Sequence, residues 1–210
     1  MNACAGSAAR VACLLLAAGT GSRFGGDKLL YPVDGRPMAA HAIQLHAGIP
    51  YALRIFVTQR RHAALAEQAA QAGFLVDYND APERGIASSI RVAMDLLDGQ
   101  LIQPDGQLIQ PDGLLFGVCD QPRLRRETVL LLLDRFREAP ERIVAPVWQG
   151  RRGNPVVFPA RFREALAHLE GDTGGSAVIR AHPDALLLVP VSDGAELTDI
   201  DTPPAPPTGF

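Results

Sequence analysis

Short, continuous apolar runs alternate along the chain with stretches of helical periodicity. The runs are Val11 to Ala17, Leu53 to Val57, Leu114 to Val118, Ile143 to Val147 and Leu186 to Val191. Runs of this kind suit strands that are buried on both faces of a parallel sheet. Helical spacing is found in Pro37 to His46, Arg61 to Ala72, Ser88 to Leu97, Glu127 to Arg137, Arg161 to Leu169 and Ser176 to Ala181. The alternation predicts an α/β three-layer sandwich around a mostly parallel sheet.

The length of 210 residues and the hydrophobic content of 47% suit one substantial core. We expect a single domain over residues 11–203, after a flexible stretch at 1–10 and before a proline-rich tail at 204–210. The heptad GQLIQPD occurs at Gly99 to Asp105 and again at Gly106 to Asp112. One duplicated unit is too little for a solenoid, so the copy is interpreted as an insertion in a surface loop.

The charge pattern and the cysteines exclude several classes of function. The formal net charge of -3 and the absence of a basic run argue against nucleic acid as a partner. Cys4, Cys13 and Cys119 are far apart and form no CxxC or Cys/His cluster, which fits a reducing cytosol. The first apolar run is too short to span a bilayer. We therefore expect a cytoplasmic protein without a membrane anchor.

A glycine-rich loop follows the first expected strand, in the segment LLLAAGTGSRFGGDK from Leu14 to Lys28. Glycines let backbone N–H groups approach phosphate oxygens, and Arg23 and Lys28 supply positive charge. The loop is not a Walker A motif, since Asp27 separates the glycine from Lys28. Phe24 stands where a Rossmann fingerprint requires its third glycine. Triphosphate binding is one interpretation, and a glycine-rich turn that only packs well is the other.

The pattern LAAG-x-G-S-R-F-G-x-D-K resembles the LAAGxSxRxGxxK signature of the molybdenum cofactor nucleotidyltransferases. Five further segments agree in order: RGIASSI, CDQP, GRRGNPVVF, GDTGG and DIDTP. The resemblance covers residues 11–203. It implies a Rossmann-like sheet of the nucleotide-diphospho-sugar transferase type and transfer of a nucleotide monophosphate from a nucleoside triphosphate to molybdopterin.

Carboxylates are needed in such a transfer because a hard cation bridges the phosphate oxygens. Asp120 follows the apolar run Leu114 to Val118, at the end of a strand where open α/β sheets bind ligands. Position alone leaves it equally suited to cap a helix. The resemblance makes Asp120 and Asp201 the expected Mg²⁺ ligands, with Asp199 second, and Arg23, Lys28 and Asp120 the expected catalytic residues. The alternation of Asp199, Ile200 and Asp201 predicts a strand with both carboxylates on one face.

The resemblance also implies binding residues for both substrates. Those expected to bind the nucleotide are Leu16, Ala17, Ala18, Gly19, Arg23, Lys28, Asp80, Gly85, Ser88 and Ser89. Those expected to bind the molybdopterin acceptor are Arg152, Asn154 and Asp172. From the residues alone, the serines are equally helix caps and the arginine of the GRRGNP turn equally faces solvent.

The choice of base depends on three positions. The guanylyl branch of the family has LAGG where this chain has LAAG, and the added methyl of Ala18 favours the smaller base of CTP. DIDTP matches the cytidylyl branch, whereas Cys119 resembles the guanylyl branch. We therefore expect CMP transfer from CTP to molybdopterin. The alternatives are a GTP-using guanylyltransferase, a transferase acting on a sugar or alditol phosphate, and a non-catalytic cofactor carrier. A client molybdoenzyme is a further partner that the resemblance allows.

Overall fold

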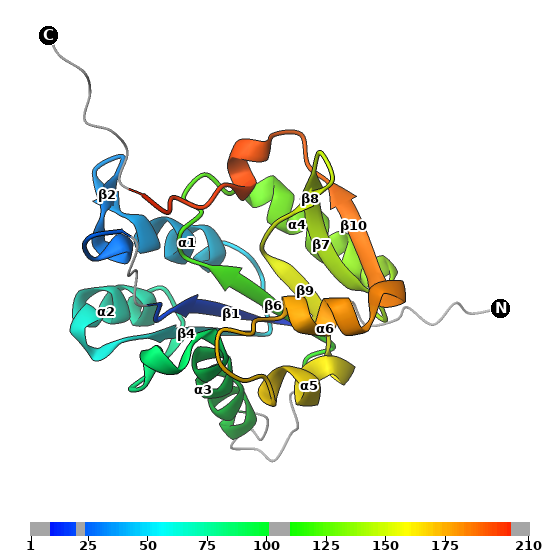
Figure 1. Cartoon of the computed structure of the whole chain (residues 1–210), viewed down its shortest axis with the longest axis horizontal. Helices are drawn as coiled ribbons and strands as arrows, with labels where there is room; N and C mark the ends of the chain where they lie inside the picture. Colours follow the sequence, from blue (N-terminus) through cyan, green and yellow to red (C-terminus); the bar gives the residue numbers. More distant parts are fainter. Residues whose placement is uncertain (1–8, 20–23, 101–109, 203–210) are drawn as a thin grey trace, which may run out of the picture.

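The computed structural model describes residues 9–19, 24–100 and 110–202, which form a sheet between two layers of helices (Figure 1). The strands of the main sheet are β1 Val11–Ala17, β4 Leu53–Thr58, β5 Leu75–Tyr78, β6 Gly113–Val118, β7 Ile143–Trp148, β8 Arg151–Arg152, β9 Val156–Pro159 and β10 Leu186–Pro190. A separate hairpin consists of β2 Pro32–Val33 and β3 Arg36–Pro37. The helices are α1 Met38–Ala47, α2 Ala63–Gln71, α3 Ile86–Gly99, α4 Arg126–Glu138, α5 Arg163–Ala167 and α6 Ser176–Ala181.

The strand order of the main sheet is β10-β7-β9-β6-β1-β4-β5, with β8 paired to β7. The pairs β1–β4, β1–β6, β4–β5 and β10–β7 are parallel. β9 is antiparallel to both of its neighbours, β6 and β7. The expectation of a mostly parallel α/β/α sandwich is thus confirmed.

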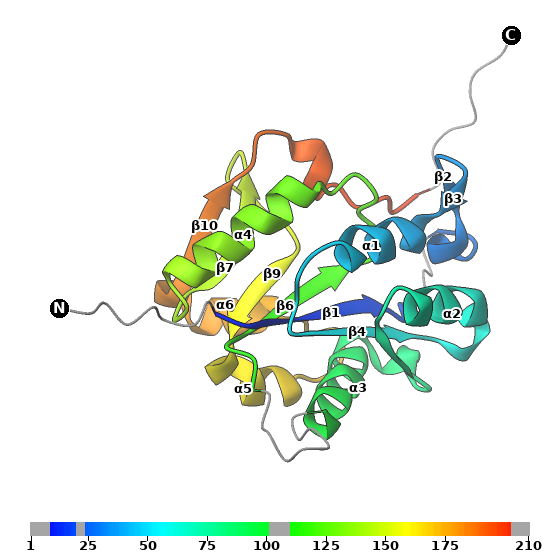
Figure 2. The ribbon, with the colours of Figure 1, turned by 180° about the vertical axis from the view of Figure 1, so that it is seen from behind.

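The two helix layers follow from the alternation of side chains along the strands. In β1, Val11, Cys13 and Leu15 face one hydrophobic cluster, whereas Ala12 and Leu14 face the other. The first cluster is completed by α1, α2 and α4, and the second by α3, α5 and α6. Figure 2 shows α1, α2 and α4 together on one side of the sheet. Because β1 is buried on both faces, its sequence is a continuous apolar run.

β9 is the element that the sequence analysis missed. It begins directly after residues 151–155, which were interpreted as a tight turn between apolar stretches, and the apolar stretch that follows was not predicted as a strand. Val156 pairs with Phe116, and Val157 pairs with both Leu115 and Val144. These partners come from β6 and β7, so long-range pairing rather than a local pattern makes this short segment a strand.

Some expectations fall outside the described residues. These are the flexible stretch at its positions 1–8, the tail from residue 203 and the duplicated heptad at positions 101–109. The division into 1–10, 11–203 and 204–210 therefore stays a prediction. In the described part of the chain, no helix has the length and apolar character that crossing a membrane requires.

Candidate functional site

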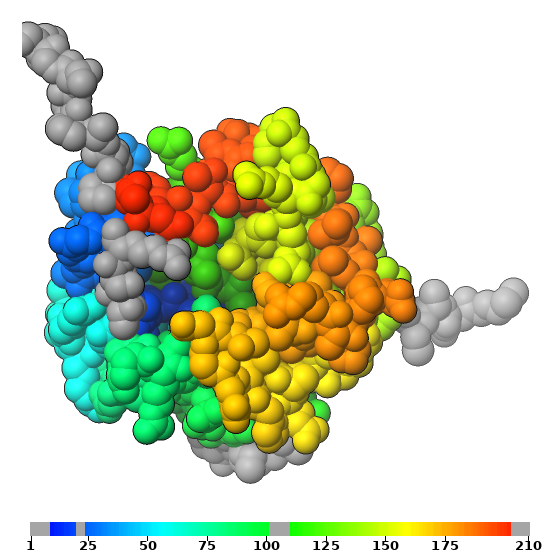
Figure 3. Space-filling view, viewed as in Figure 1, coloured from blue at the N-terminus to red at the C-terminus, as the bar shows by residue number. Residues whose placement is uncertain are grey.

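The carboxyl ends of β1 and β6 lie side by side because these strands are parallel neighbours. The chain leaves β1 toward β4 and β5 on one side and returns in β6 on the other. Open α/β sheets bind ligands at such a reversal of strand order. Figure 3 shows this face of the molecule hollowed between the red C-terminal segment and the green segments that include the start of α3.

Lys28 lies between two carboxylates that are distant in the sequence. Its Nζ donates hydrogen bonds to Asp120 Oδ2 at 2.8 Å and to Asp201 Oδ1 at 2.7 Å. The side chain of Lys28 is 12% exposed, that of Asp120 25% and that of Asp201 66%. Burial alone would lower the pKa of Lys28, but the two carboxylates outweigh it and raise that pKa above its ordinary value. The only lysine of the chain is therefore a charged group at the end of the sheet.

The segment around Asp199 reaches Asp120 through the backbone as well. Ile200 N donates a 3.0 Å hydrogen bond to Asp120 O, and Gln121 Nε2 donates one of 2.8 Å to Asp199 Oδ1. The prediction of a strand at Asp199–Asp201 is wrong, because this segment bonds to the loop after β6 rather than to a strand. Although Asp199 is exposed, desolvation of its carboxylate and the charge of Asp120 raise its pKa.

Glu196 anchors the same segment to the start of α4. Its side chain is 2% exposed and accepts hydrogen bonds from Thr128 Oγ1 and Arg125 Nη2, and from Arg125 N at 3.3 Å. Arg125 precedes the first turn of α4, where a carboxylate complements the unpaired N–H groups. Because Glu196 lies in the turn formed by residues 194–197, this anchor fixes the position of the segment with Asp199 and Asp201 that follows the turn.

A cavity of about 270 Å³ lies beside this cluster and is called the Asp120 cavity. Its lining residues are Leu16, Ala18, Gly19, Pro82, Gly85, Ile86, Ser89, Val118, Cys119, Asp120 and Asp172. The sequence analysis assigned six of these residues to the nucleotide or the metal: Leu16, Ala18, Gly19, Gly85, Ser89 and Asp120. They come from the ends of β1 and β6 and from the start of α3, which the fold brings together.

A second cavity, of about 240 Å³, is called the Arg152 cavity. It is lined by Leu16, Ile86, Ile90, Phe116, Gly117, Val118, Arg152, Gly153, Asn154, Val156, Phe158, Gly174, Gly175, Ser176 and Ile179. Leu16, Ile86 and Val118 line both cavities, so the two adjoin. Arg152 and Asn154, both expected to bind the acceptor, lie in the second one.

Positive charge marks the Arg152 cavity. Arg152 Nη2 donates a 2.7 Å hydrogen bond to Ser176 Oγ, and the side chain makes no ion pair with the described residues. Burial and the charge of Arg180 lower the pKa of Arg152 from its ordinary value. A half-buried guanidinium without a carboxylate partner attracts an anion, which it can bind with two parallel hydrogen bonds.

Asp172 lies in the Asp120 cavity, whereas the sequence analysis placed it with the acceptor. Gly85 explains the position. With a φ of +83°, Gly85 lies so close to the next loop that a Cβ would be 2.4 Å from Gly171 O and 2.5 Å from Asp172 Oδ1. Ala87 N also donates to Gly171 O at 3.1 Å. The start of α3 therefore holds the carboxylate of Asp172 at the edge of this cavity.

The two serines at the start of α3 are held by Asn79. Asn79 is 3% exposed, and its Nδ2 donates to Ser88 Oγ at 2.7 Å and to Ser89 Oγ at 2.9 Å. Ser88 Oγ also donates to Gly85 O at 2.7 Å, and Ser89 lines the Asp120 cavity. Ser88 thus supports the turn, and Ser89 is the serine that the structure brings to the cavity.

The structure does not bring Asp80 to either cavity. Its carboxylate accepts two hydrogen bonds from Arg60, at 2.8 and 2.9 Å, and both side chains are exposed. Arg60 in turn lies over the ring of Tyr78, with its guanidinium carbon 5.0 Å from the ring centroid. Both oxygens of the Asp80 carboxylate are thus paired with one guanidinium.

The residues at the end of β1 and directly after it differ in their exposure. Leu16 lines both cavities, and Gly19 is exposed at the Asp120 cavity. Ala17 is 1% exposed and packs in the first hydrophobic cluster, and Ala18 is 2% exposed and packs in the second. Arg23 lies outside the described residues.

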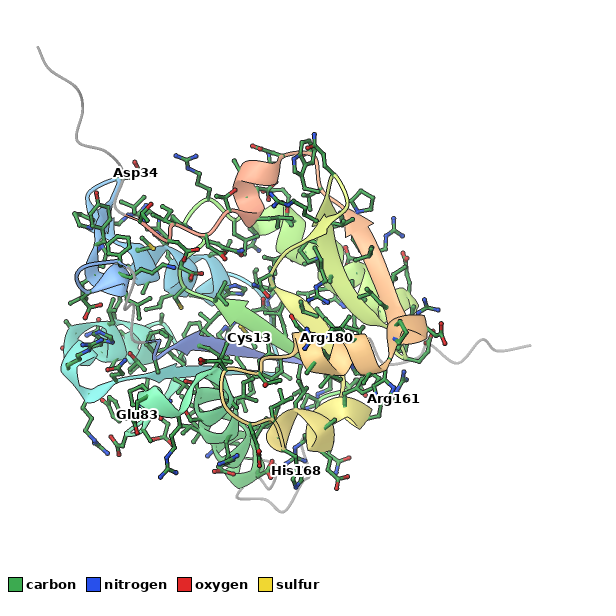
Figure 4. The ribbon with its side chains drawn as sticks, in the orientation of Figure 1. Cys13, Asp34, Glu83, Arg161, His168 and Arg180 are labelled. Carbon is green, nitrogen blue, oxygen red and sulfur yellow. The ribbon has the colours of Figure 1, made fainter. Side chains whose placement is uncertain are left out.

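The two cysteines within the described residues give no sign of covalent catalysis. Cys13 and Cys119 are free and 0% and 2% exposed, and burial raises the pKa of both thiols. The nearest base to Cys13 is His46, whose pKa burial lowers to about 3. Figure 4 shows Cys13 near the centre of the molecule, whereas the labelled Glu83 and Arg161 lie at its periphery.

Several supporting residues were not found from the sequence. Gln121 and Glu196 hold the C-terminal segment, and Gln59 and His62 contact the loop after β1. Gln121 lies in the motif CDQP, where only Asp120 was singled out, and Gln59 and His62 lie in the polar cluster TQRRH at the end of β4. Glu196 lies in a stretch without a regular pattern.

Comparison with known proteins supports this geometry. The model of the MobA-like NTP transferase domain matches residues 13–186. A probable molybdenum cofactor guanylyltransferase from Thermococcus gammatolerans is 28% identical over 157 residues, which are 72% of this chain and 71% of that protein.

Solved structures have the same fold. The crystal structure of Rv0371c from Mycobacterium tuberculosis superposes with a TM-score of 0.74 at 23% identity, over 93% of this chain and 94% of the other. Molybdopterin-guanine dinucleotide biosynthesis protein A from Archaeoglobus fulgidus gives 0.64 at 12% identity, over 91% and 93%. With the family model covering most of its length, the chain belongs to the MobA-like NTP transferase family and is a nucleotidyltransferase.

Proposed function

We propose that this nucleotidyltransferase transfers GMP from GTP to the terminal phosphate of molybdopterin and releases pyrophosphate. One observation carries the proposal. The Lys28 ammonium lies between Asp201 and Asp120, Asp120 lines one cavity, and a second cavity with a cationic side chain adjoins it. The nucleotide would occupy the Asp120 cavity and the anionic acceptor the Arg152 cavity. The two substrates would then meet at Leu16, Ile86 and Val118, which line both cavities.

The donor set suits Mg²⁺, which takes oxygen ligands from one or two carboxylates and from substrate phosphates. Asp120 Oδ1 is buried and has no hydrogen-bond partner among the described residues, so it is an available oxygen. The described ranges contain no group of three or more acidic, histidine or cysteine side chains that would bind a metal unaided. Asp120 and Asp201 would therefore hold the ion together with the triphosphate, and the ion would neutralise phosphate charge.

The chain's own residues would position the reactants and stabilise charge. An oxygen of the acceptor phosphate forms a bond to the α-phosphorus of GTP while the bond from that phosphorus to the bridging oxygen breaks. Pyrophosphate leaves with the electron pair, and Lys28 stabilises the charge that grows on it. The acceptor oxygen is already ionised, so no general base is required.

Ala18 alone does not decide the base. It is 2% exposed, packs in the second hydrophobic cluster and also lines the Asp120 cavity. The relative from Thermococcus gammatolerans is named as a guanylyltransferase, and Cys119 resembles that branch. CTP remains the second candidate because LAAG and DIDTP match the cytidylyl branch.

Pyrophosphate release from ATP, CTP, GTP and UTP, with and without molybdenum cofactor and Mg²⁺, tests the proposal. Cofactor-dependent release that is fastest with GTP is expected. Faster release with CTP would overturn the base, and no release with any nucleotide would overturn the acceptor. Asp120→Asn should abolish turnover at every Mg²⁺ or Mn²⁺ concentration while the circular dichroism spectrum stays unchanged.

A further inference from the structure

Two side chains after β4 contact both described ends of the glycine-rich loop that leads from β1 to Lys28. Gln59 Nε2 donates hydrogen bonds to Ala18 O at 2.8 Å and to Gly19 O at 3.3 Å. His62 Nε2 lies 2.7 Å from Asp27 Oδ2. The first residue thus holds the start of the loop, and the second holds its end.

The contact of Gln59 fixes the orientation of a peptide group. In a planar trans peptide, the C=O of Ala18 and the N–H of Gly19 point in opposite directions. Because Gln59 binds the carbonyl, the N–H of Gly19 is directed away from Gln59. Gly19 lines the Asp120 cavity, and backbone N–H groups at such positions bind phosphate oxygens.

The contact of His62 acts on Lys28 through Asp27. The side chain of His62 is 0% exposed, so its bond to Asp27 is shielded from water. Asp27 Oδ1 accepts a 3.2 Å hydrogen bond from Leu29 N and caps the short 3₁₀ turn Lys28–Leu30. The turn begins at Lys28, and its direction sets where the ammonium lies.

Thr58 joins the two contacts into one set. Its Oγ1 donates a 3.2 Å hydrogen bond to Ala17 O and lies 3.2 Å from His62 Nδ1. Thr58 is fully buried at the end of β4, a strand paired in parallel with β1. Through Thr58, both ends of the loop are therefore held against the central sheet.

We propose that Gln59 and His62 are positioning residues for nucleotide transfer. They hold the Gly19 backbone and the Lys28 ammonium in the arrangement that receives a triphosphate, and neither touches the substrate itself. This inference rests on the proposed function, because it assigns the loop to the triphosphate. It predicts that loss of either contact weakens binding of GTP and of pyrophosphate but not of the acceptor.

The test compares Gln59→Ala, Gln59→Glu, His62→Leu and His62→Gln. Gln59→Ala should raise the KM for GTP and the Kd for pyrophosphate with Mg²⁺ by roughly tenfold, the usual effect of losing such hydrogen bonds. Gln59→Glu should weaken both further, since a carboxylate repels the two carbonyls and the triphosphate. His62→Gln keeps a side-chain N–H donor and should restore part of the loss caused by His62→Leu.

Gln71→Ala is the matched control, because it removes an exposed amide whose side-chain hydrogen bond among the described residues goes to Glu67 on the same helix, α2. Its kinetic constants should equal those of the wild type. Backbone amide exchange at Leu29, followed without nucleotide, should be faster in His62→Leu than in the wild type. This readout reports the loop itself and does not depend on the reaction.

The outcomes separate the two proposals. The wild type must bind GTP and pyrophosphate for the positioning role to be tested. If each variant, Gln59→Ala and His62→Leu, then changes the KM for GTP and the KM for the acceptor by the same factor, the positioning role is overturned. Unchanged exchange at Leu29 in His62→Leu would also overturn it. If the wild type binds no nucleotide while that exchange is faster in the variant, the proposed function fails and the loop contact stands.

Discussion

Lys28 Nζ lies 2.8 Å from Asp120 Oδ2, although 92 residues separate the two in the sequence. One follows the loop after β1 and the other follows β6, so the parallel pairing of these strands brings them together. Asp201 joins them from the C-terminal segment. The pair places a cation and a carboxylate next to each other, beside the position proposed for the phosphates.

Lys28→Met should lower kcat/KM by roughly 10²–10³-fold, the range for losing one group that stabilises transition-state charge. Lys28→Arg should recover only part of the lost kcat/KM, because a planar guanidinium does not replace a compact ammonium between two carboxylates. The carboxylates raise the pKa of Lys28, so its charge should cause no change in rate between pH 6 and 9.

Pyrophosphate release at saturating acceptor provides the measurement. A thermal unfolding curve separates lost catalysis from lost structure. Near-normal kcat/KM in Lys28→Met would remove this residue from the reaction.

The strands were predictable where burial on both faces makes the pattern local. β1 matches its predicted bounds, Val11–Ala17, because each of its side chains enters one of two apolar clusters. β9 was missed because it is short and its strand conformation depends on long-range pairing with β6 and β7. The meeting of Lys28 with Asp120 followed from the family resemblance and from the position of each after a strand.

Contacts between loops were not predictable. The resemblance assigned Asp172 to the acceptor. The order of motifs along the chain does not tell which of two adjoining cavities a loop borders. The close approach of Gly85 to Gly171 brings Asp172 to the Asp120 cavity. The resemblance assigned Asp80 to the nucleotide, whereas in the structure its carboxylate pairs with Arg60 and lines neither cavity.

Asp172→Asn and Arg152→Gln should affect different substrates. Asp172 borders the Asp120 cavity, so the asparagine should change the KM for GTP by several-fold and leave the acceptor KM unchanged. Arg152 borders the other cavity, so its variant should raise the acceptor KM by roughly 10–100-fold, as expected for a charge-assisted contact. Steady-state kinetics with each substrate varied in turn give both constants. A change in the same constant for both variants would contradict the assignment of the cavities.

Gly85→Ala should damage both stability and nucleotide binding. The φ of +83° is strained for alanine, and the new Cβ would meet Gly171 backbone atoms at 2.4 Å. A cost of about 1–3 kcal/mol is typical for such backbone strain. Nucleotide affinity should fall with the displaced loop, as measured by calorimetry.

Gly99→Ala is the control for that variant, since among the described residues no atom outside its own helix turn and chain neighbours lies within 4 Å of the added methyl. Its melting temperature should equal or exceed that of the wild type. If Gly85→Ala behaved in the same way, the close packing of the two loops would not be a feature of the protein in solution.

Glu196→Gln should lower the free energy of unfolding by about 1–3 kcal/mol at pH 7, the usual cost of weakening a buried charged hydrogen bond. Burial alone would raise the pKa of Glu196, but hydrogen bonds from Arg125 and Thr128 outweigh it and hold the pKa below 4.5. Since the folded state prefers the carboxylate, this stabilisation is complete above pH 4.5 and is lost as the pH falls through the lowered pKa.

Urea unfolding of the wild type and the variant between pH 2.5 and 8 measures this difference. The two should differ most at neutral pH and converge in acid. Glu138→Gln removes an exposed carboxylate paired with Arg135, and it should cost little at any pH. Because Glu196 anchors the segment that carries Asp201, Glu196→Gln should also lower kcat at neutral pH, which Glu138→Gln should not. A difference between wild type and Glu196→Gln that grew below pH 4.5 would show that the carboxylate is not the form the fold stabilises.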